Sequence, residues 1–313
     1  MNFEKFVAKR LHGKSNIKHS ISKPILKMAI AAVSLSIAVM IISIATSKGL
    51  QQKITSKVTG FTANIQVSSL DLNKSLDANP FKIDSSFAKS ILAIKGVDYF
   101  QTQITKNALL KTEFDFEGIL VKGVDKNYNW EFISKNLVDG IVPNYTSDTK
   151  SNDIVISKVL ATKLQLNLND KALVYFQGLK NNKARIRKFL IVGIYETGVE
   201  LFDDVYILAD LRHLQKINSW SEDEYSSIEI GLKSNTNPKL IYEELEDISP
   251  YNARVRSAKE IYPQIFDWIN LFDLNTLVIL LIMLIVASIN MISSLLIIIL
   301  ERTKMIGLLK ALG

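Results

Sequence analysis

The chain of 313 residues contains no cysteine and only three histidines. Without cysteine it can form neither a disulfide bond nor a thiolate metal site, and it has no thiol nucleophile. His12 and His19 precede the first long apolar stretch, which leaves His213 as the one histidine in the central part of the sequence. A metal site built from several histidines is therefore excluded, and a Ser-His-Asp site is disfavoured. We predict no catalytic residue, no metal site and no cofactor.

A phosphate-binding loop is also absent. Gly13-Lys14-Ser15 has the closing residues of such a loop, but the pattern requires a glycine five residues earlier, where Ala8 stands. No strand pattern precedes this segment. Any nucleotide hydrolysis associated with this chain must therefore come from another polypeptide.

Charge is absent from Leu274–Leu300 and is limited to Lys27 within Ile25–Ala45. A helix needs roughly 20 residues, at about 1.5 Å each, to cross the apolar part of a bilayer. The sequence therefore predicts transmembrane helices at 24–47 and 274–300. A cleaved signal peptide is the alternative for the first, but its basic and apolar regions are both longer than those of signal peptides.

The excess of positive charge lies at the two ends of the chain. Of 38 basic residues, seven lie before or at the start of the first apolar stretch and three follow the second, which leaves 28 basic and 29 acidic residues between. Basic flanks are typical of the cytoplasmic side, so both ends are predicted to be cytoplasmic and the central segment exported. A nearly neutral central segment also argues against a nucleic-acid partner, despite the pI of 9.2.

The exported segment, 48–273, alternates short helix and strand patterns with short connections, which is typical of an α+β domain. We expect two lobes, about 48–152 and 153–257, and a stalk helix over 258–273 that leads into the second span. Residues 1–23 are expected to form a cytoplasmic amphipathic segment, although a solvated tail explains them equally well.

Small and polar residues recur along one side of each apolar stretch. Small residues at helical spacing let another membrane helix approach closely, and an amide deep in the bilayer should face protein because an unpaired amide is costly there. We therefore predict packing within a multi-helix assembly through Ala29, Ala32, Ser36 and Ser43 of the first stretch and Ala287, Asn290 and Ser294 of the second.

The closing segment, 301–313, contains the most specific pattern in the chain. Glu301-Arg302, Ile306, Leu309-Lys310 and Leu312-Gly313 resemble the "E-[RK]-x-x-x-I-x-x-L-[KR]-x-[LI]-G" stretch of bacterial ABC-transporter permeases of the lipoprotein-releasing type (LolC/LolE), which are related to MacB and FtsX. Further segments, spread over nearly the whole chain, are similar to motifs of the same family. Val121–Asp125 resembles "x-x-G-V-D", and Val192–Gly198 resembles "V-x-G-I-F-x-T-G".

This resemblance implies a MacB-like periplasmic core domain between two membrane helices, in a non-catalytic permease subunit of the bacterial inner membrane. It implies three kinds of partner besides membrane lipid: a separate ABC ATPase, a second permease subunit that is a copy or a paralogue, and a lipoprotein or periplasmic protein. In the family, the closing segment starts the coupling helix that docks into the ATPase, which assigns that role to Glu301, Arg302, Ile306, Leu309, Lys310 and Leu312.

Two other functions stay open, and the length of the chain is unusual for the family. Family members continue with two further transmembrane helices, so we expect a truncated reading frame or a fragment. One alternative is a two-span sensor or anchored binding module that signals through its ends. The other is a membrane-tethered hydrolase that uses carboxylates such as Asp203 and Asp204.

Overall fold

The computed structural model describes residues 22–70, 79–112, 115–146, 149–177 and 184–301, together with 303, 307, 310 and 311. The chain divides into two compact units. The first comprises Met1–Gln51 and Trp268–Gly313, and the second comprises Gln52–Asp267.

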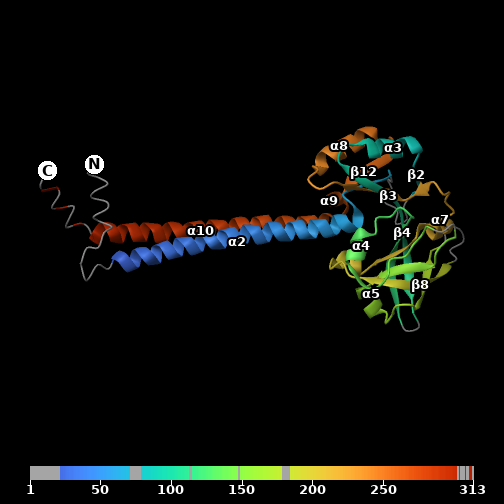
Figure 1. The fold of residues 1–313 in the computed structure, drawn as a ribbon, viewed down its shortest axis with the longest axis horizontal. Helices are drawn as coiled ribbons and strands as arrows, with labels where there is room; N and C mark the ends of the chain where they lie inside the picture. Colours follow the sequence, from blue (N-terminus) through green and yellow to red (C-terminus); the bar gives the residue numbers. More distant parts are fainter. Residues whose placement is uncertain are drawn as a thin grey trace. The chain divides into compact units, whose positions relative to one another are not determined.

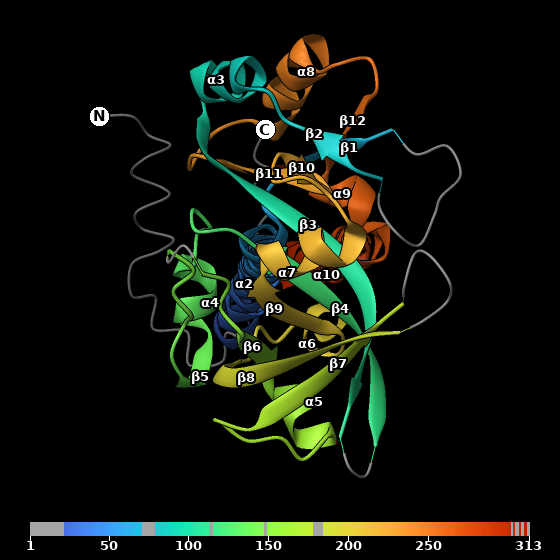
Figure 2. The ribbon, with the colours of Figure 1, turned by 90° about the vertical axis from the view of Figure 1, so that its right-hand side faces the viewer.

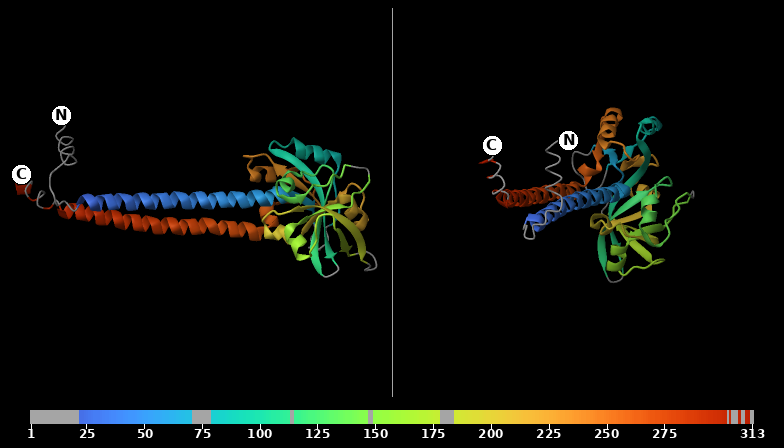
Figure 3. Two further views of the ribbon diagram at one scale, coloured as in Figure 1. Left: turned by 60° about the horizontal axis from the view of Figure 1, so that its bottom comes forward. Right: turned by 60° about the vertical axis from the view of Figure 1, so that its left-hand side comes forward.

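Two long helices, α2 (Ser22–Thr62) and α10 (Pro263–Glu301), provide the described part of the first unit. Within that unit they lie side by side in opposite directions (Figures 1 and 3). Lys48 Nζ lies 3.0 Å from Asp273 Oδ1, and Gln51 Nε2 donates to the same oxygen at 2.9 Å. The segments Lys27–Thr62 and Pro263–Leu300 are each long and apolar enough to cross a membrane. The two apolar stretches are therefore helical, as expected.

The second unit is built around a mixed sheet of ten strands in the order β12-β1-β11-β3-β4-β9-β6-β8-β5, in which β7 pairs with β3 and β8. The pairs β4–β9 and β6–β8 are parallel and the others are antiparallel. The strands are β1 (Ile65–Ser69), β3 (Val97–Lys111), β4 (Phe116–Val124), β5 (Leu137–Gly140), β6 (Asp153–Ser157), β7 (Lys171–Phe176), β8 (Arg185–Tyr195), β9 (Tyr206–Asp210), β11 (Ser227–Leu232) and β12 (Ala253–Ser257).

Short helices complete the unit, and the α+β fold class predicted from the sequence is confirmed. A separate two-stranded sheet pairs β2 (Phe81–Lys82) with β10 (Glu224–Tyr225). The helices are α3 (Ser85–Ala93), α4 (Glu131–Lys135), α5 (Lys158–Lys163), α6 (Glu200–Asp203), α7 (Leu211–Asn218), α8 (Pro238–Ile248) and α9 (Ala258–Ile261).

The order of strands in the sheet differs from the expected division of the chain into lobes. Strand β1 lies between β11 and β12, which come from the C-terminal end of the segment between the two long helices. The long strand β3 pairs with β11 along its first half and with β4 and β7 along its second half. Strands from both sides of residue 153 therefore interleave, and that residue marks no boundary in the sheet.

Helices α3 and α8 cover one face of the sheet at the end formed by β12, β1 and β11 (Figure 2). Side chains alternate between the faces of a strand, so Ile65 and Val67 of β1 enter this core while Gln66 lies on the opposite face. Ile228 and Ile230 of β11 follow the same rule. Local capping supports the arrangement, because the Asp84 side chain accepts a hydrogen bond from Phe87 N at the start of α3. The uncovered face of these strands is polar.

The expected stalk helix over 258–273 is interrupted. Helix α9 starts with a capping box formed by Ser257 and Glu260 and ends at Ile261. Tyr262 leaves the helical conformation, with φ −122° and ψ 57°, and α10 starts at Pro263. Proline disfavours a helical conformation in the residue before it and is suited to the first position of a helix. The sequence therefore encodes two helices here, and the expectation of one was wrong.

The last turns of α2 lie in the second unit and are anchored there by aromatic packing. Phe61 is 1% exposed, and its ring lies 4.5 Å from that of Phe202 in a stacked arrangement. Tyr206 meets the Phe61 ring edge-on at 5.2 Å. Such pairs stabilise beyond the apolar area that they bury.

We predict that Phe61→Ala lowers the free energy of unfolding by roughly 3 to 5 kcal/mol, because it opens a cavity in this aromatic cluster. Phe116→Ala is the matched control, since Phe116 is 62% exposed. The measurement is urea denaturation of the full chain in detergent, followed by tryptophan fluorescence. Equal stability of the two variants would show that the end of α2 is not anchored through Phe61.

Candidate functional site: a polar pocket beside a buried ion pair

A buried ion pair links β4 to β11 across the intervening strand β3. Lys122 Nζ lies 2.8 Å from Glu229 Oε1 and 3.0 Å from Oε2, and each side chain is 2% exposed. Gln101 of β3 donates to Glu229 Oε2 at 2.7 Å, so both carboxylate oxygens are bonded. The Lys122 ammonium also lies 4.9 Å from the centre of the Phe61 ring, within the range of a cation–π contact.

The same ammonium holds the end of helix α2. Lys122 Nζ donates to the Phe61 carbonyl oxygen at 2.7 Å. The last carbonyls of a helix have no partner within the helix and carry its negative dipole end, so a cation there is favourable. Lys122 thus joins the last turn of α2 to two strands of the sheet. We call Lys122, Glu229 and the Phe61 carbonyl the helix–sheet joint.

Burying the charges of the joint costs free energy unless Lys122 and Glu229 are both present. Desolvation lowers the pKa of the Lys122 ammonium, and the neighbouring Glu229 carboxylate acts in the opposite direction. In an apolar interior, the attraction between two paired charges offsets much of the free energy lost when they leave water. A single charge without its partner has no such compensation. Loss of either side chain is therefore expected to destabilise the unit strongly.

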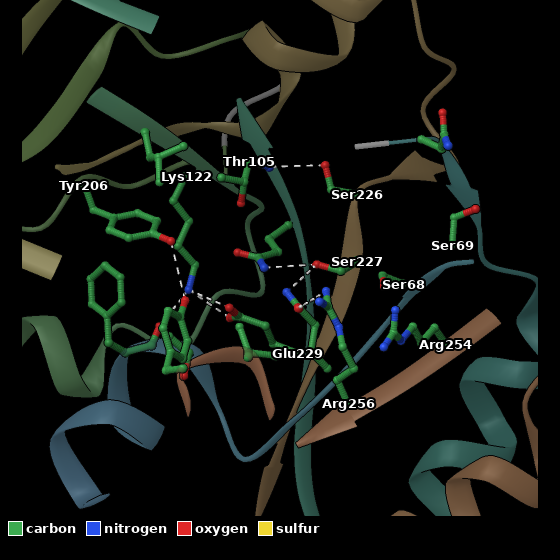
Figure 4. Close-up of a pocket in the computed structure, with 18 of the residues that line it drawn as sticks. Ser68, Ser69, Thr105, Lys122, Tyr206, Ser226, Ser227, Glu229, Arg254 and Arg256 are labelled. Carbon is green, nitrogen blue, oxygen red and sulfur yellow. Dashed lines mark hydrogen bonds and ion pairs between the residues drawn. The ribbon is translucent and has the colours of Figure 1, made fainter. Parts of the chain in front are cut away.

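A pocket of about 520 Å³ opens beside the joint on the polar face of the sheet (Figure 4). Gln66 of β1 and Gln103 of β3 both donate to Ser227 Oγ of β11, at 2.8 and 3.0 Å. Arg254 and Arg256 of β12 form another side of the pocket. The alternation of strand residues explains this face, because the neighbouring positions supply the core beneath α3 and α8.

Of the two carboxylates singled out from the sequence, Asp203 has a structural role. Asp203 is 3% exposed and accepts hydrogen bonds from Thr197 N, Thr197 Oγ1 and Gly198 N at 2.8–3.0 Å. It thereby fixes the turn before α6, where Gly198 has φ +68°. Asp204 is exposed. Within the described part of the chain, no group of three or more His, Asp or Glu side chains could hold a metal ion.

The residues predicted to pack in the membrane lie on the less exposed side of each helix. Ser36 and Ser294 are 4% and 6% exposed, whereas large apolar residues elsewhere on the helices, such as Leu35 and Leu284, are largely exposed. The other five are partly buried, namely Ala29, Ala32, Ser43, Ala287 and Asn290. Contact of these sides with a further membrane helix stays a prediction.

The predicted ATPase-coupling residues fall mainly outside the described part of the chain. Glu301 is the last residue of α10, and Lys310 is exposed. The remaining four lie outside the described residues, namely Arg302, Ile306, Leu309 and Leu312.

The motif Val121–Asp125 includes Lys122, but the motif predicts neither the joint nor the pocket. The sequence does contain a signal for the joint, since Lys122 is a lone charge in a run of apolar and small residues, Gly118–Val124. No local pattern joins it to Glu229, which lies more than a hundred residues away.

Comparison with known proteins matches residues 28–248 to the family described as the MacB-like periplasmic core domain. A curated relative is the lipoprotein-releasing system transmembrane protein LolC of Buchnera aphidicola subsp. Schizaphis graminum (strain Sg), 24% identical over 221 residues. The alignment covers 67% of this chain and 51% of that protein, so the chain spans about half the length of this relative.

Solved structures with 14% sequence identity were also found. The periplasmic region of MacB from Actinobacillus actinomycetemcomitans aligns over 68% of this chain and 97% of that structure, with a TM-score of 0.44. The extracellular domain of the noncanonic ABC-type transporter YknZ from Gram-positive bacteria aligns over 62% and 99%, with a TM-score of 0.42.

We predict that Lys122→Met lowers the free energy of unfolding by roughly 3 to 5 kcal/mol, because it leaves the Glu229 carboxylate buried without a counter-charge. The double variant Lys122→Met/Glu229→Gln should be more stable than Lys122→Met alone, since it also removes the orphaned charge. Lys135→Met is the control, because its ion pair with Glu131 is exposed and should contribute little. A double variant less stable than Lys122→Met in urea denaturation would contradict this account.

A second prediction concerns His213, which packs edge-on against Phe189 with its Nε2 2.9 Å from the Ser151 carbonyl oxygen. Burial lowers the pKa of His213 below 6.5, and the Ser151 hydrogen bond offsets this only in part. Its contribution to stability is therefore fully present above pH 6.5 and is lost as pH falls through the lowered pKa of the folded state. The loss is at most about 1.4 kcal/mol per pH unit.

The measurement compares urea denaturation of the wild type and His213→Gln at pH 7.5 and pH 5. The wild type should lose more stability than the variant over this range. An equal or greater loss in the variant would assign the pH dependence to other groups.

Proposed function

The chain belongs to the family of the MacB-like periplasmic core domain, and from this premise we propose that it is the permease subunit of an ABC transporter. In this proposal ATP is hydrolysed on a separate chain, and the permease converts that cycle into movement of its extracytoplasmic domain. The permease itself carries no catalysis. The chain is a membrane protein of a permease-like family, and the bacterial inner membrane with both ends cytoplasmic is the proposed location.

The observation that carries the proposal is the path of helix α2. Its apolar stretch belongs to the first unit, and the same helix continues to Thr62, where the second unit binds its end. Lys122 fixes the Phe61 carbonyl, and Lys57 Nζ donates to the Thr197 carbonyl oxygen in the turn held by Asp203. A displacement of this helix would therefore be passed to the sheet through two separate contacts.

The partners follow from the same proposal. An ABC ATPase would bind the cytoplasmic closing segment, through Glu301, Arg302, Ile306, Leu309, Lys310 and Leu312. A second permease subunit, either a copy or a paralogue, would complete the membrane part through the small-residue sides of α2 and α10. The extracytoplasmic domain would act on a lipoprotein or another periplasmic protein, by release, export or mechanical activation.

We predict that the triple variant Glu301→Ala/Leu309→Ala/Lys310→Ala loses association with the ATPase that copurifies with the wild-type complex, while its membrane insertion is unchanged. The loss is expected because the variant removes both the charges and an apolar contact of the proposed coupling helix. The matched control is Lys239→Ala/Leu240→Ala/Glu243→Ala, which changes the same residue types on the exposed surface of α8.

The measurement is the amount of ATPase retained on the tagged permease after detergent extraction. The control should retain the wild-type amount. Retention of the ATPase by the triple variant at the wild-type level would overturn the proposed coupling role.

A further inference from the structure

The polar pocket contains two arginines that the helix–sheet joint does not use. Arg254 and Arg256 lie two residues apart on β12, the edge strand of the sheet, and both line the pocket (Figure 4). Among the residues that the structure describes, the Arg254 side chain has no hydrogen-bond or ion-pair partner. Arg256 has a single long contact, from its Nη2 to Gln66 Oε1 at 3.5 Å.

The buried part of Arg256 needs an explanation. Its Nε is buried and has no hydrogen-bond partner in the described part of the chain. A donor in this position has lost water without gaining an acceptor, which costs free energy. Burial lowers the pKa of Arg256, and the adjacent Arg254 charge lowers it further. Charges on an edge strand often serve to prevent aggregation, and this accounts for the more exposed Arg254 but not for Arg256.

The charges around the pocket do not balance. Lys122 and Glu229 neutralise each other, and Glu229 is the one carboxylate among the described residues that line the pocket. The two arginines therefore give the described residues that line the pocket a net charge of +2. A guanidinium binds phosphate and carboxylate groups through two parallel hydrogen bonds, which a single ammonium cannot do.

Size and the remaining lining residues narrow the ligand further. A volume of about 520 Å³ suits a small molecule. The hydroxyl groups of Ser68 and Ser69, at the end of β1, line the same pocket as the two arginines. Such a lining favours a polar ligand over an apolar one, because buried hydroxyl and amide groups need partners.

We propose that this pocket binds a small polar molecule through a phosphate or carboxylate group held by Arg254 and Arg256. The Ser68 and Ser69 hydroxyls contact the polar body of the ligand. The site lies beside the helix–sheet joint, so its occupation stabilises the part of the sheet that receives α2. The proposal does not depend on ATPase coupling.

The test uses the purified full chain in detergent, with inorganic phosphate and succinate as separate probes. Thermal unfolding is followed while each probe is titrated against sodium chloride of equal ionic strength. Binding is expected to raise the unfolding temperature, and Arg254→Gln or Arg256→Gln should weaken it about tenfold, the effect of losing one charge-assisted hydrogen bond. Arg187→Gln is the matched control, because Arg187 lies on β8 and does not line this pocket.

Each outcome decides the proposal. A rise in the unfolding temperature with phosphate alone identifies a phosphate group as the ligand, and a rise with succinate alone identifies a carboxylate. Either result supports the site if Arg187→Gln binds the probe as the wild type does. No shift beyond that of chloride with either probe overturns it. Equal shifts in the wild type and in Arg254→Gln also overturn it, and this variant keeps the test valid if Arg256→Gln does not fold, because Arg254 is exposed.

Discussion

The Lys122 ammonium is the contact on which the arrangement of the second unit depends. The ammonium provides the counter-charge for the buried Glu229 carboxylate and a hydrogen-bond donor for the Phe61 carbonyl at the end of α2. These two groups are in turn the acceptors that a buried ammonium requires. Each group would be costly to bury without the others. Because these groups come from β4, β11 and α2, one side chain joins elements that are far apart in the sequence. The Phe61 ring, next to this polar contact, packs against Phe202.

The joint lies on the polar face of the sheet, and the core beneath the opposite face explains that polarity. Helices α3 and α8 bury the other face of β12, β1 and β11, so the alternating positions of these strands are free to carry polar groups. Near the joint these groups are paired, as in the bonds of Gln66 and Gln103 to Ser227. Farther along the face lie Arg254 and Arg256, whose positive charges have no carboxylate partner among the residues that the structure describes. The helix–sheet joint and the proposed ligand site thus lie on the same polar face of the sheet.

Sequence reasoning succeeded where the signal is local and periodic. The two apolar stretches predicted long helices, and the mixture of short patterns predicted an α+β fold, which the structure confirms. The prediction of one continuous stalk helix was wrong, although Pro263 is a local signal for the interruption. The predicted division into two lobes at residue 153 differs from the strand order for another reason. Ile65 pairs with Ile230, and no local sequence pattern reveals which distant strands become neighbours. The need for glycine at position 123 also depends on a distant contact. A Cβ there would lie 2.7 Å from Leu214 Cδ1, and the sequence alone does not show that these residues are neighbours.

The most direct test of the account is amide hydrogen exchange in the last turn of α2, measured on the wild type and on Lys122→Met under conditions in which both are folded. If Lys122 holds this helix end to the sheet, exchange at Val58–Thr62 should accelerate in the variant far more than exchange at Ile228 and Ile230, which lie in the core beneath α3 and α8. Equal acceleration at both places, or none at the helix end, would show that α2 is held by packing alone and would contradict the central role of Lys122.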